Sequence, residues 1–180
     1  MSLIIRILRK EDPLDRINLW SLKTDTMRET INHTILKYWG PVVLWVGFTF
    51  LMSTGTFSEE NTSRIIEPVV KFFVPAISTH ALGILTALIR KLAHLTEYFI
   101  LSLLLFRAFK GGSAERHAWR WALSSILVVI LLAASDEFHQ GFEVSRTASM
   151  IDVGIDTVGG ILGQCARSGF HYVRVRKEST

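Results

Sequence analysis

Apolar runs of membrane-spanning length set the strongest constraint on this sequence. A bilayer core of ~30 Å needs roughly 20 apolar residues per helix, and suitable runs lie at about 38–53, 89–109, 119–134 and 150–166. Backbone polar groups cannot stay unpaired in lipid, so such runs must be helical. We therefore predict an all-α integral membrane protein whose core is a four-transmembrane-helix bundle.

Composition and charge agree with this prediction. Hydrophobic residues make up 49% of the 180 residues and charged residues only 20%, with a mean hydropathy of +0.32. The formal net charge of +4 is no argument for a nucleic-acid partner, because Lys and Arg gather at the ends of the apolar runs. Cys165 is the only cysteine, which excludes an intrachain disulfide and argues against redox chemistry.

The basic residues also predict the orientation in the membrane. They precede the first run, separate the second from the third, and follow the fourth, so the three regions share one side. The positive-inside rule makes this side the cytoplasm. We therefore predict a multi-pass protein of a bacterial plasma membrane with both termini cytoplasmic. The residues concerned are Lys23, Arg28, Lys37, Arg107, Lys110, Arg116, Arg120, Arg167, Arg174, Arg176 and Lys177.

The sequence divides into three parts by composition. Residues 1–36 form an N-terminal cytoplasmic or interfacial extension, 37–167 the transmembrane domain, and 168–180 a basic cytoplasmic tail. The basic, apolar stretch at 3–10 is too short to span and is typical of a helix that lies on anionic lipid. An alternative start at Met27 is equally compatible with the sequence.

Two prolines help to place the helices around the first span. We expect Pro41 in the first turn of that span, where a proline is tolerated. The segment 54–87 is too polar to span, but its apolar residues recur at helical spacing. We predict an amphipathic extracytoplasmic helix here, between spans 1 and 2, that ends at Pro75. Its apolar residues are Ile65, Ile66, Val69, Val70, Phe72 and Phe73.

Ionisable residues lie where three of the spans reach the outer face. On the second span Lys91, His94 and Glu97 or Tyr98 share one helical face. The part of this span that follows, 99–106, is expected to be apolar. Asp136, His139 and Gln140 are similarly placed at the end of the third, and Asp152 and Asp156 lie at the start of the fourth with Gly154, Gly159, Gly160 and Gly163. We expect these faces to meet in a shallow extracytoplasmic pocket.

Two interpretations of this polar pocket are open. The groups can simply pair, Lys91 or Arg90 with Asp136 and Arg146 with Asp152, and fix the bundle geometry; Asp156 would then bond a neighbouring helix. Alternatively they form a site, because ionisable groups within a membrane are costly unless they have a function. The candidate catalytic residues are then His94, Glu97, Asp136, Glu137 and His139. The candidate ligand-binding residues are Arg90, Lys91, Tyr98, Gln140, Arg146 and Asp152.

Particular chemistry follows from these residue types. Arg90, Lys91 and Arg146 are suited to a phosphate or carboxylate, and the histidines and acids to general acid–base catalysis. A metal held by His94, His139 and a carboxylate is a weaker hypothesis, because His-x-x-Glu without a second nearby histidine is a poor ligand pattern. We therefore assign no metal ligands, and the sequence leaves the cofactor unknown.

Several of these motifs together resemble the VanZ-like family, named after a protein linked to teicoplanin resistance in bacteria. The resemblance covers about 38–167, and the Asp-Glu-x-His-Gln element is its most specific part. The family leads us to expect Asn where this chain has Asp156. The motifs are Arg90-Lys91-x-x-His94-x-x-x-Tyr98, Asp136-Glu137-x-His139-Gln140-x-Phe142, Ser145-Arg146, Asp152 and Gly159-x-x-x-Gly163.

The resemblance implies a place and a phenotype, and it leaves open whether the protein is an enzyme. The expected partner is a membrane lipid or a lipid-linked envelope precursor at the outer leaflet, with a lipoglycopeptide as a further candidate. A non-catalytic binding or accessory protein is the main alternative. A proton-coupled transporter of small solutes is less well supported, because polar groups are expected at one end of the spans only.

Overall fold

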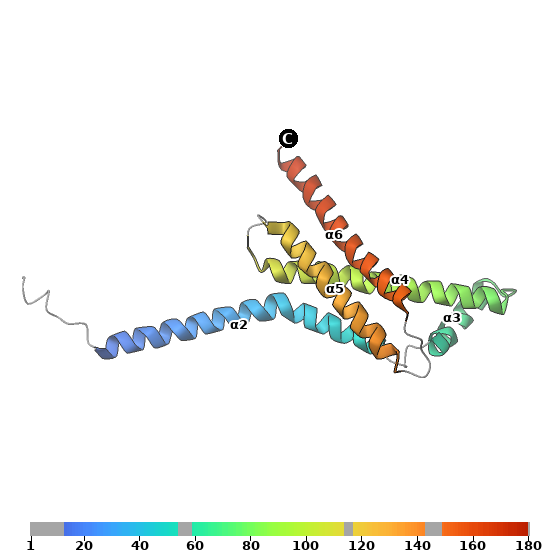
Figure 1. Cartoon of the computed structure of the whole chain (residues 1–180), viewed down its shortest axis with the longest axis horizontal. Coiled ribbons are helices and arrows are strands. Elements are labelled where there is room, and N and C mark those ends of the chain that lie inside the picture. The colour runs from blue at the N-terminus through green and yellow to red at the C-terminus, as the bar shows by residue number, and fades with distance from the viewer. Residues whose placement is uncertain (1–12, 54–58, 114–116, 143–148, 180) are drawn as a thin grey trace, which may run out of the picture. The chain divides into compact units, whose positions relative to one another are not determined.

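The structure is a computed structural model that describes residues 13–53, 59–113, 117–142 and 149–179, with side chains for 33–53, 63–113, 117–142 and 149–179. The regular elements of these ranges are the helices α2 (Pro13–Met52), α3 (Glu59–Phe73), α4 (Thr79–Lys110), α5 (Ala118–Gln140) and α6 (Met150–Glu178) (Figure 1). This confirms the predicted all-α fold. By packing, the chain divides into residues 1–37 and 38–180, and the second unit is described below; the basic stretch at 3–10 lies outside the described residues.

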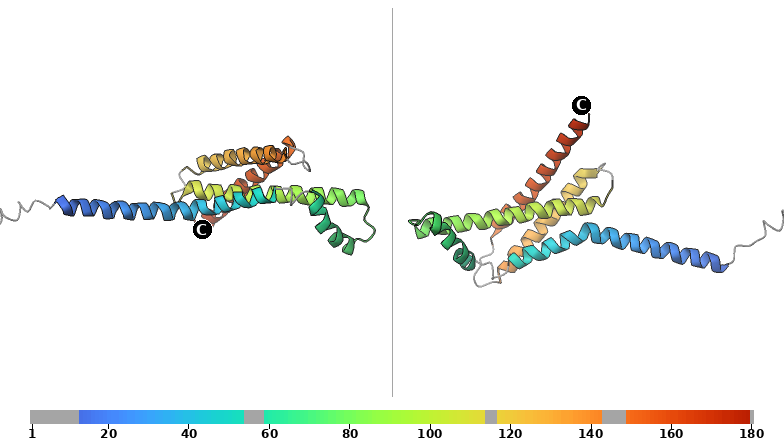
Figure 2. Two further views of the ribbon diagram at one scale, coloured as in Figure 1. Left: turned by 90° about the horizontal axis from the view of Figure 1, so that it is seen from below. Right: turned by 180° about the vertical axis from the view of Figure 1, so that it is seen from behind.

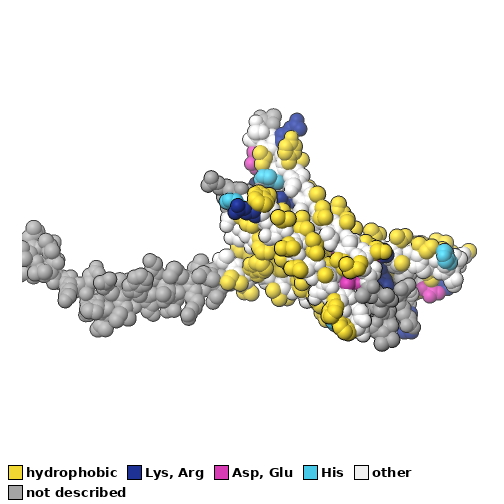
Figure 3. All heavy atoms as spheres, in the orientation of Figure 1, with side chains coloured by type: hydrophobic (Ala, Val, Ile, Leu, Met, Phe, Trp, Pro, Cys, Tyr) yellow, Lys and Arg dark blue, Asp and Glu magenta, His cyan; other side chains and the backbone are white. Residues whose placement is uncertain are grey.

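Three helices of the described chain are long and apolar enough to span a membrane: His33–Met52, Thr79–Lys110 and Ala118–Gln140. Apolar side chains spread over the visible outer surface of the bundle, as expected for helices that face lipid (Figure 3). Helix α6 is not among the three, since Asp152, Asp156 and Arg167 interrupt its apolar residues. The membrane-helix character is therefore supported, and a fourth span stays a prediction.

Local signals fix both ends of α4. The Ser78 hydroxyl accepts a hydrogen bond from the backbone N–H of Ala81 at 3.2 Å and so caps the first turn. At the other end Gly111 adopts the left-handed conformation with φ 53°, and its N–H donates to the Arg107 carbonyl. With 32 residues, α4 is about 48 Å long, which exceeds the ~30 Å hydrocarbon core.

Several predicted boundaries were wrong. Pro41 is not in a first turn but inside the long helix α2. The third run does not end at Ala134, because α5 continues through the polar motif to Gln140. Helix α6 continues as far as Glu178, so residues 168–178 of the predicted basic tail are helical, and their cytoplasmic location stays a prediction. In each case a helix persists beyond its apolar run, because polar residues such as Gln, Glu, Lys and Arg are also good helix formers.

Helix α6 crosses α4 and packs on it more extensively than on any other helix, and it also contacts α5 (Figures 1 and 2). The buried core lies where these helices and the second half of α2 meet. It contains Val42, Tyr98, Leu101, Leu105, Ala108, Val129 and Ala133. Outside this core, α3 is an exposed amphipathic helix: Ile65, Val69 and Phe72 are more than half exposed, and Glu67 pairs with Lys71.

Candidate ligand-binding site at the junction of three helices

Glycines bring α6 into backbone contact with α4. A Cβ atom on Gly159 would overlap the Leu95 carbonyl oxygen, and one on Gly163 would lie 2.7 Å from that of Phe99. We call Gly159 and Gly163 the glycine seam. Small residues at such contacts let helices approach closely, so side chains just beyond the seam on α4 and α6 must face each other. The predicted role of these glycines in close helix packing is thus visible in the structure.

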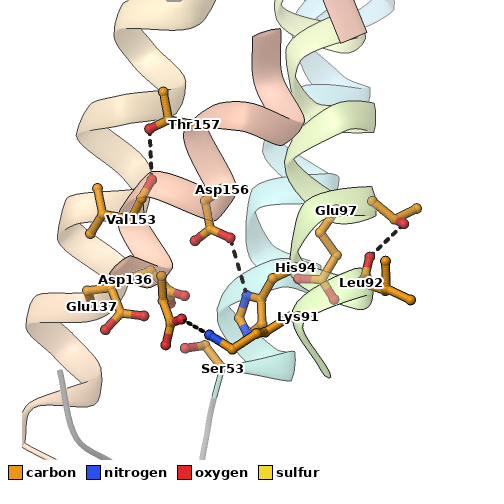
Figure 4. A network of polar contacts seen from close by, with 12 residues as sticks. Ser53, Lys91, Leu92, His94, Glu97, Asp136, Glu137, Val153, Asp156 and Thr157 are labelled. Carbon is orange, nitrogen blue, oxygen red and sulfur yellow. Dashed lines mark hydrogen bonds and ion pairs between the residues drawn. The ribbon is translucent and has the colours of Figure 1, made fainter. Parts of the chain in front are cut away.

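Two base–acid pairs follow the seam toward the start of both helices (Figure 4). In the outer pair, Lys91 Nζ lies 2.6 Å from Asp152 Oδ1, and the two side chains are 46% and 37% exposed. In the inner pair, His94 Nδ1 lies 3.9 Å from Asp156 Oδ1, with exposures of 23% and 1%. The inner pair lies about one helical turn C-terminal to the outer pair on both helices. The bases of α4 and the acids of α6 therefore form two successive pairs that lead from the exposed side into the bundle.

Helix α5 closes the other side of this cluster. The Gln140 side-chain amide donates to Asp136 Oδ2 and to Ser53 Oγ, both at 2.9 Å. Glu137 accepts a hydrogen bond of 2.7 Å from the backbone N–H of Ser149, the residue before α6. Asp136, Glu137 and Gln140 are all buried. Glu137 therefore holds the N-terminus of α6 in place, where a negative charge is favourable.

The interior of the cluster contains buried acids with carboxyl oxygens that lack hydrogen-bond partners in the described structure. Asp156 is 1% exposed and Asp136 3% exposed. Both side-chain oxygens of Asp156, and Oδ1 of Asp136, have no hydrogen-bond partner in the part of the chain that the structure describes. Burial of an isolated carboxylate costs several kcal/mol, so this arrangement calls for a proton, a cation or a ligand. Glu97, drawn beside His94 in Figure 4, adds a half-buried carboxylate about one turn further along α4.

The structure does not bring all predicted site residues together. His139 is exposed and its ring packs against that of Phe50, with 6.2 Å between centroids. Tyr98 is 2% exposed and belongs to the core. Arg90 is half-buried next to Lys91, and Arg146 lies outside the described residues. His139 is displaced because Asp136 and Gln140, four residues apart, already occupy the inner face of α5, and position 139 points to its flank.

Three further expectations need correction. Lys91 pairs with Asp152 instead of Asp136, because the seam joins α4 to α6. Asp156 makes no hydrogen bond to a neighbouring helix within the described structure, and instead faces His94. It was not among the predicted site residues, although its spacing of one turn from Asp152 is a usable signal.

The run at 99–106 is also not wholly apolar. Ser102 is fully buried and donates to the Gly160 carbonyl at 2.8 Å, and it accepts from the Gln164 amide at 2.7 Å. Gln164 in turn accepts from Arg167, whose guanidinium stacks on Phe106 at 3.9 Å. This polar link between α4 and α6 is internally hydrogen-bonded, so its evident role is to join the two helices.

The donor set does not form a metal centre among the described residues, where no three His, Cys, Asp or Glu side chains converge closely enough to ligate one ion. What the cluster offers chemically is a half-exposed imidazole backed by a buried acid, next to a lysine–carboxylate pair that reaches solvent. These groups can exchange protons or take up a polar ligand group.

Comparison with known proteins identifies the family. The chain matches VanZ/LLP1 over residues 38–167, which include every described residue of the cluster. No curated protein and no solved structure was found to match the chain. A family match that covers well over half of the sequence agrees with the motif resemblance, and the chain belongs to the VanZ/LLP1 family.

Proposed function

We propose that this protein acts at the outer face of a bacterial cell membrane on a lipid-linked or cell-envelope ligand, as expected for proteins associated with teicoplanin resistance. The observation that carries the proposal is the cluster itself: His94, Lys91 and four acids converge from α4, α5 and α6, of which α4 and α5 are long and apolar enough to span a membrane. Ionisable groups within a membrane protein bundle cost free energy and are therefore usually functional.

The distribution of charge supports the outer location. Several basic residues lie at the helix ends remote from the cluster, whereas Arg90 and Lys91 lie at it: Arg107 and Lys110 end α4, Arg120 begins α5, and Arg174 and Arg176 end α6. By the positive-inside rule those remote ends face the cytoplasm. The acid-rich end then faces outward, where lipid-anchored envelope intermediates and lipoglycopeptides are found.

The depth of the cluster supports a ligand held near the membrane surface. Lys91 and Asp152 are each partly exposed, whereas Asp156 behind them is buried. A polar headgroup at the interface would meet the outer pair first, and His94 next. Lys91 offers the ammonium group for a phosphate or carboxylate, and His94 offers a proton donor or acceptor.

A resistance assay tests this proposal. A Gram-positive host would express the wild type, Lys91→Met or His94→Gln at matched membrane levels, and its susceptibility to teicoplanin and vancomycin would be compared. The control is His171→Gln, because His171 lies near the opposite end of α6 and is exposed. We expect the wild type and the control to raise teicoplanin tolerance selectively and both cluster variants to abolish it. Cluster variants that behave like the wild type would refute the assignment of the site, and an inactive wild type would refute the phenotype.

A non-catalytic binding role is the second candidate, favoured by the mutual pairing of Lys91 with Asp152, which leaves no obvious free nucleophile. Binding of fluorescent teicoplanin to the purified protein in nanodiscs distinguishes an enzyme from a binding protein for that ligand. If the protein is an enzyme, His94→Gln should lose tolerance while binding persists. If it only binds, both should be lost together.

A further inference from the structure

We propose that His94 and Asp156 hold one proton between them and act as a single acid–base unit, in which the buried carboxyl group positions the imidazole that meets the ligand. This inference deepens the proposed function, because it assigns roles within the same site. It makes Asp156 a positioning residue and His94 the group that contacts the ligand. The expected ligand class is one with a group that gives or accepts a proton, such as a phosphate, an amine or a hydroxyl.

The placement of the two side chains favours these roles. Asp156 is 1% exposed, whereas His94 is 23% exposed and lies between it and the outer pair. Nδ1 of His94 faces Asp156, and the other ring nitrogen lies on the opposite side of the ring (Figure 4). The imidazole therefore lies between the buried carboxyl group and the site entrance. A carboxylate behind a histidine is a known way to fix its tautomer and orientation.

The distance between the partners leaves room for this unit to tighten. Nδ1 and Oδ1 are 3.9 Å apart, about 1 Å longer than a hydrogen bond. Bonds between catalytic groups are often long without ligand and shorten when it binds. The tightening would involve the His94 and Asp156 side chains, because the glycine seam already holds the backbones of α4 and α6 together.

The surroundings of Asp156 explain why the pair retains a proton. Neither of its carboxyl oxygens has a hydrogen bond in the described structure, and four further acids interact with it electrostatically. Lys91 is paired with Asp152, and Tyr98 is buried nearby. An additional negative charge here is strongly disfavoured. The four acids are Asp136 and Glu137 from α5, Asp152 from α6 and Glu97 from α4.

The proton transfer is balanced within the pair. When the O–H bond of Asp156 breaks, the proton forms an N–H bond at Nδ1 of His94, and a neutral acid with a neutral imidazole becomes a carboxylate with an imidazolium. The net charge of the pair is zero in both forms, so the transfer adds no charge to the bundle. A proton on the opposite nitrogen can then pass to the ligand or to water. This leaves the pair with one negative charge until a proton returns from the ligand or from water, which restores the starting form.

Nuclear magnetic resonance of the ligand-free protein tests the unit directly. The protein carries ¹⁵N-histidine and ¹³C-labelled aspartate carboxyl groups, in nanodiscs of phosphatidylglycerol and phosphatidylethanolamine at fixed pH. His94→Gln assigns the imidazole signal by its loss. The test variant is Asp156→Asn, and the matched control is Asp152→Asn, which makes the same chemical change one turn away in the outer pair. Asp156→Glu restores an acid at the test position.

We expect Asp156→Asn to move the His94 Nδ1 resonance across a large part of the range between protonated and unprotonated nitrogen. Asp152→Asn should leave it nearly unchanged, and Asp156→Glu should restore it in part. If Asp156→Asn fails to fold, the reciprocal experiment remains: His94→Gln should shift the Asp156 carboxyl resonance. An unchanged resonance in either direction, or an equal shift with Asp152→Asn, would overturn the inference.

This result is independent of the resistance assay. A coupled pair with no effect of His94→Gln on teicoplanin tolerance would leave the acid–base unit intact and refute the proposed function. An uncoupled pair together with loss of tolerance would refute the unit and retain the site.

Discussion

Gly163→Ala is the substitution whose effect can be worked out most directly from the structure. Its new Cβ would lie 2.7 Å from the Phe99 carbonyl oxygen, whereas ordinary contact begins at 3.4 Å, so α6 must retreat from α4 by about 0.7 Å. The obstacle is backbone and cannot rotate away. Overpacking of this kind costs about 1–3 kcal/mol, and the retreat also stretches the bond from Gln164 to Ser102, now 2.7 Å.

The matched control is Gly154→Ala on the same helix, where nothing lies within 4 Å of the added atom. Both substitutions replace a helical glycine, so both gain about 1 kcal/mol of helix propensity, and their difference isolates the contact. Reversible unfolding in mixed micelles, titrated with sodium dodecyl sulfate and followed by circular dichroism, gives the two free energies. We expect Gly163→Ala to be less stable than Gly154→Ala by about 1–3 kcal/mol. Equal stabilities would refute the close backbone contact.

Three further predictions use other parts of the structure. Asp152→Asn removes the outer pair, which is roughly half exposed, so it should cost less than about 1 kcal/mol in the same titration; a greater loss would mean that lipid or protein shields the pair. Gln140→Leu leaves Ser53 and Asp136 without their shared donor and should cost about 1–3 kcal/mol; no loss would show that these bonds are not formed. Phe72, 79% exposed on α3, should lie at the lipid surface: the fluorescence of Phe72→Trp should be quenched by lipids brominated near the headgroup, and a signal insensitive to them would place α3 in water.

Hydropathy was sufficient to predict the helical membrane character, but not the helix ends. Segment 38–53 was identifiable because lipid requires a long apolar run. That α2 continues through Pro41 was not, because a proline removes one hydrogen bond without preventing a helix on both sides of it. The sequence predicts Asp136, His139 and Gln140 on one helical face at the end of the third span, and α5 includes them because a helix can extend beyond the apolar layer.

The site was predictable in its composition but only partly in its pairing. The sequence places Lys91, His94 and Asp152 at helix ends on one side of the membrane, and helical spacing alone suggests which of them share a face. Which acid pairs with Lys91 and His94 depends on which helices are in contact, and the glycine seam determines this. The seam brings Asp152 and Asp156 next to α4, whereas Asp136 is hydrogen-bonded to Gln140. The outward position of His139 likewise depends on how α5 is rotated, which spacing does not specify.

Helix α6 is unbroken over 29 residues, about 44 Å at the usual rise per residue. It carries the acids of both pairs near one end and exposed Arg174 and Arg176 near the other. The seam holds it in close backbone contact with α4 between these ends. Such an element is a lever with its pivot inside the bundle: a tilt that opens the acid-bearing end swings the basic end the opposite way. A displacement of either end of α6 is thereby transmitted to its other end through a single rigid helix.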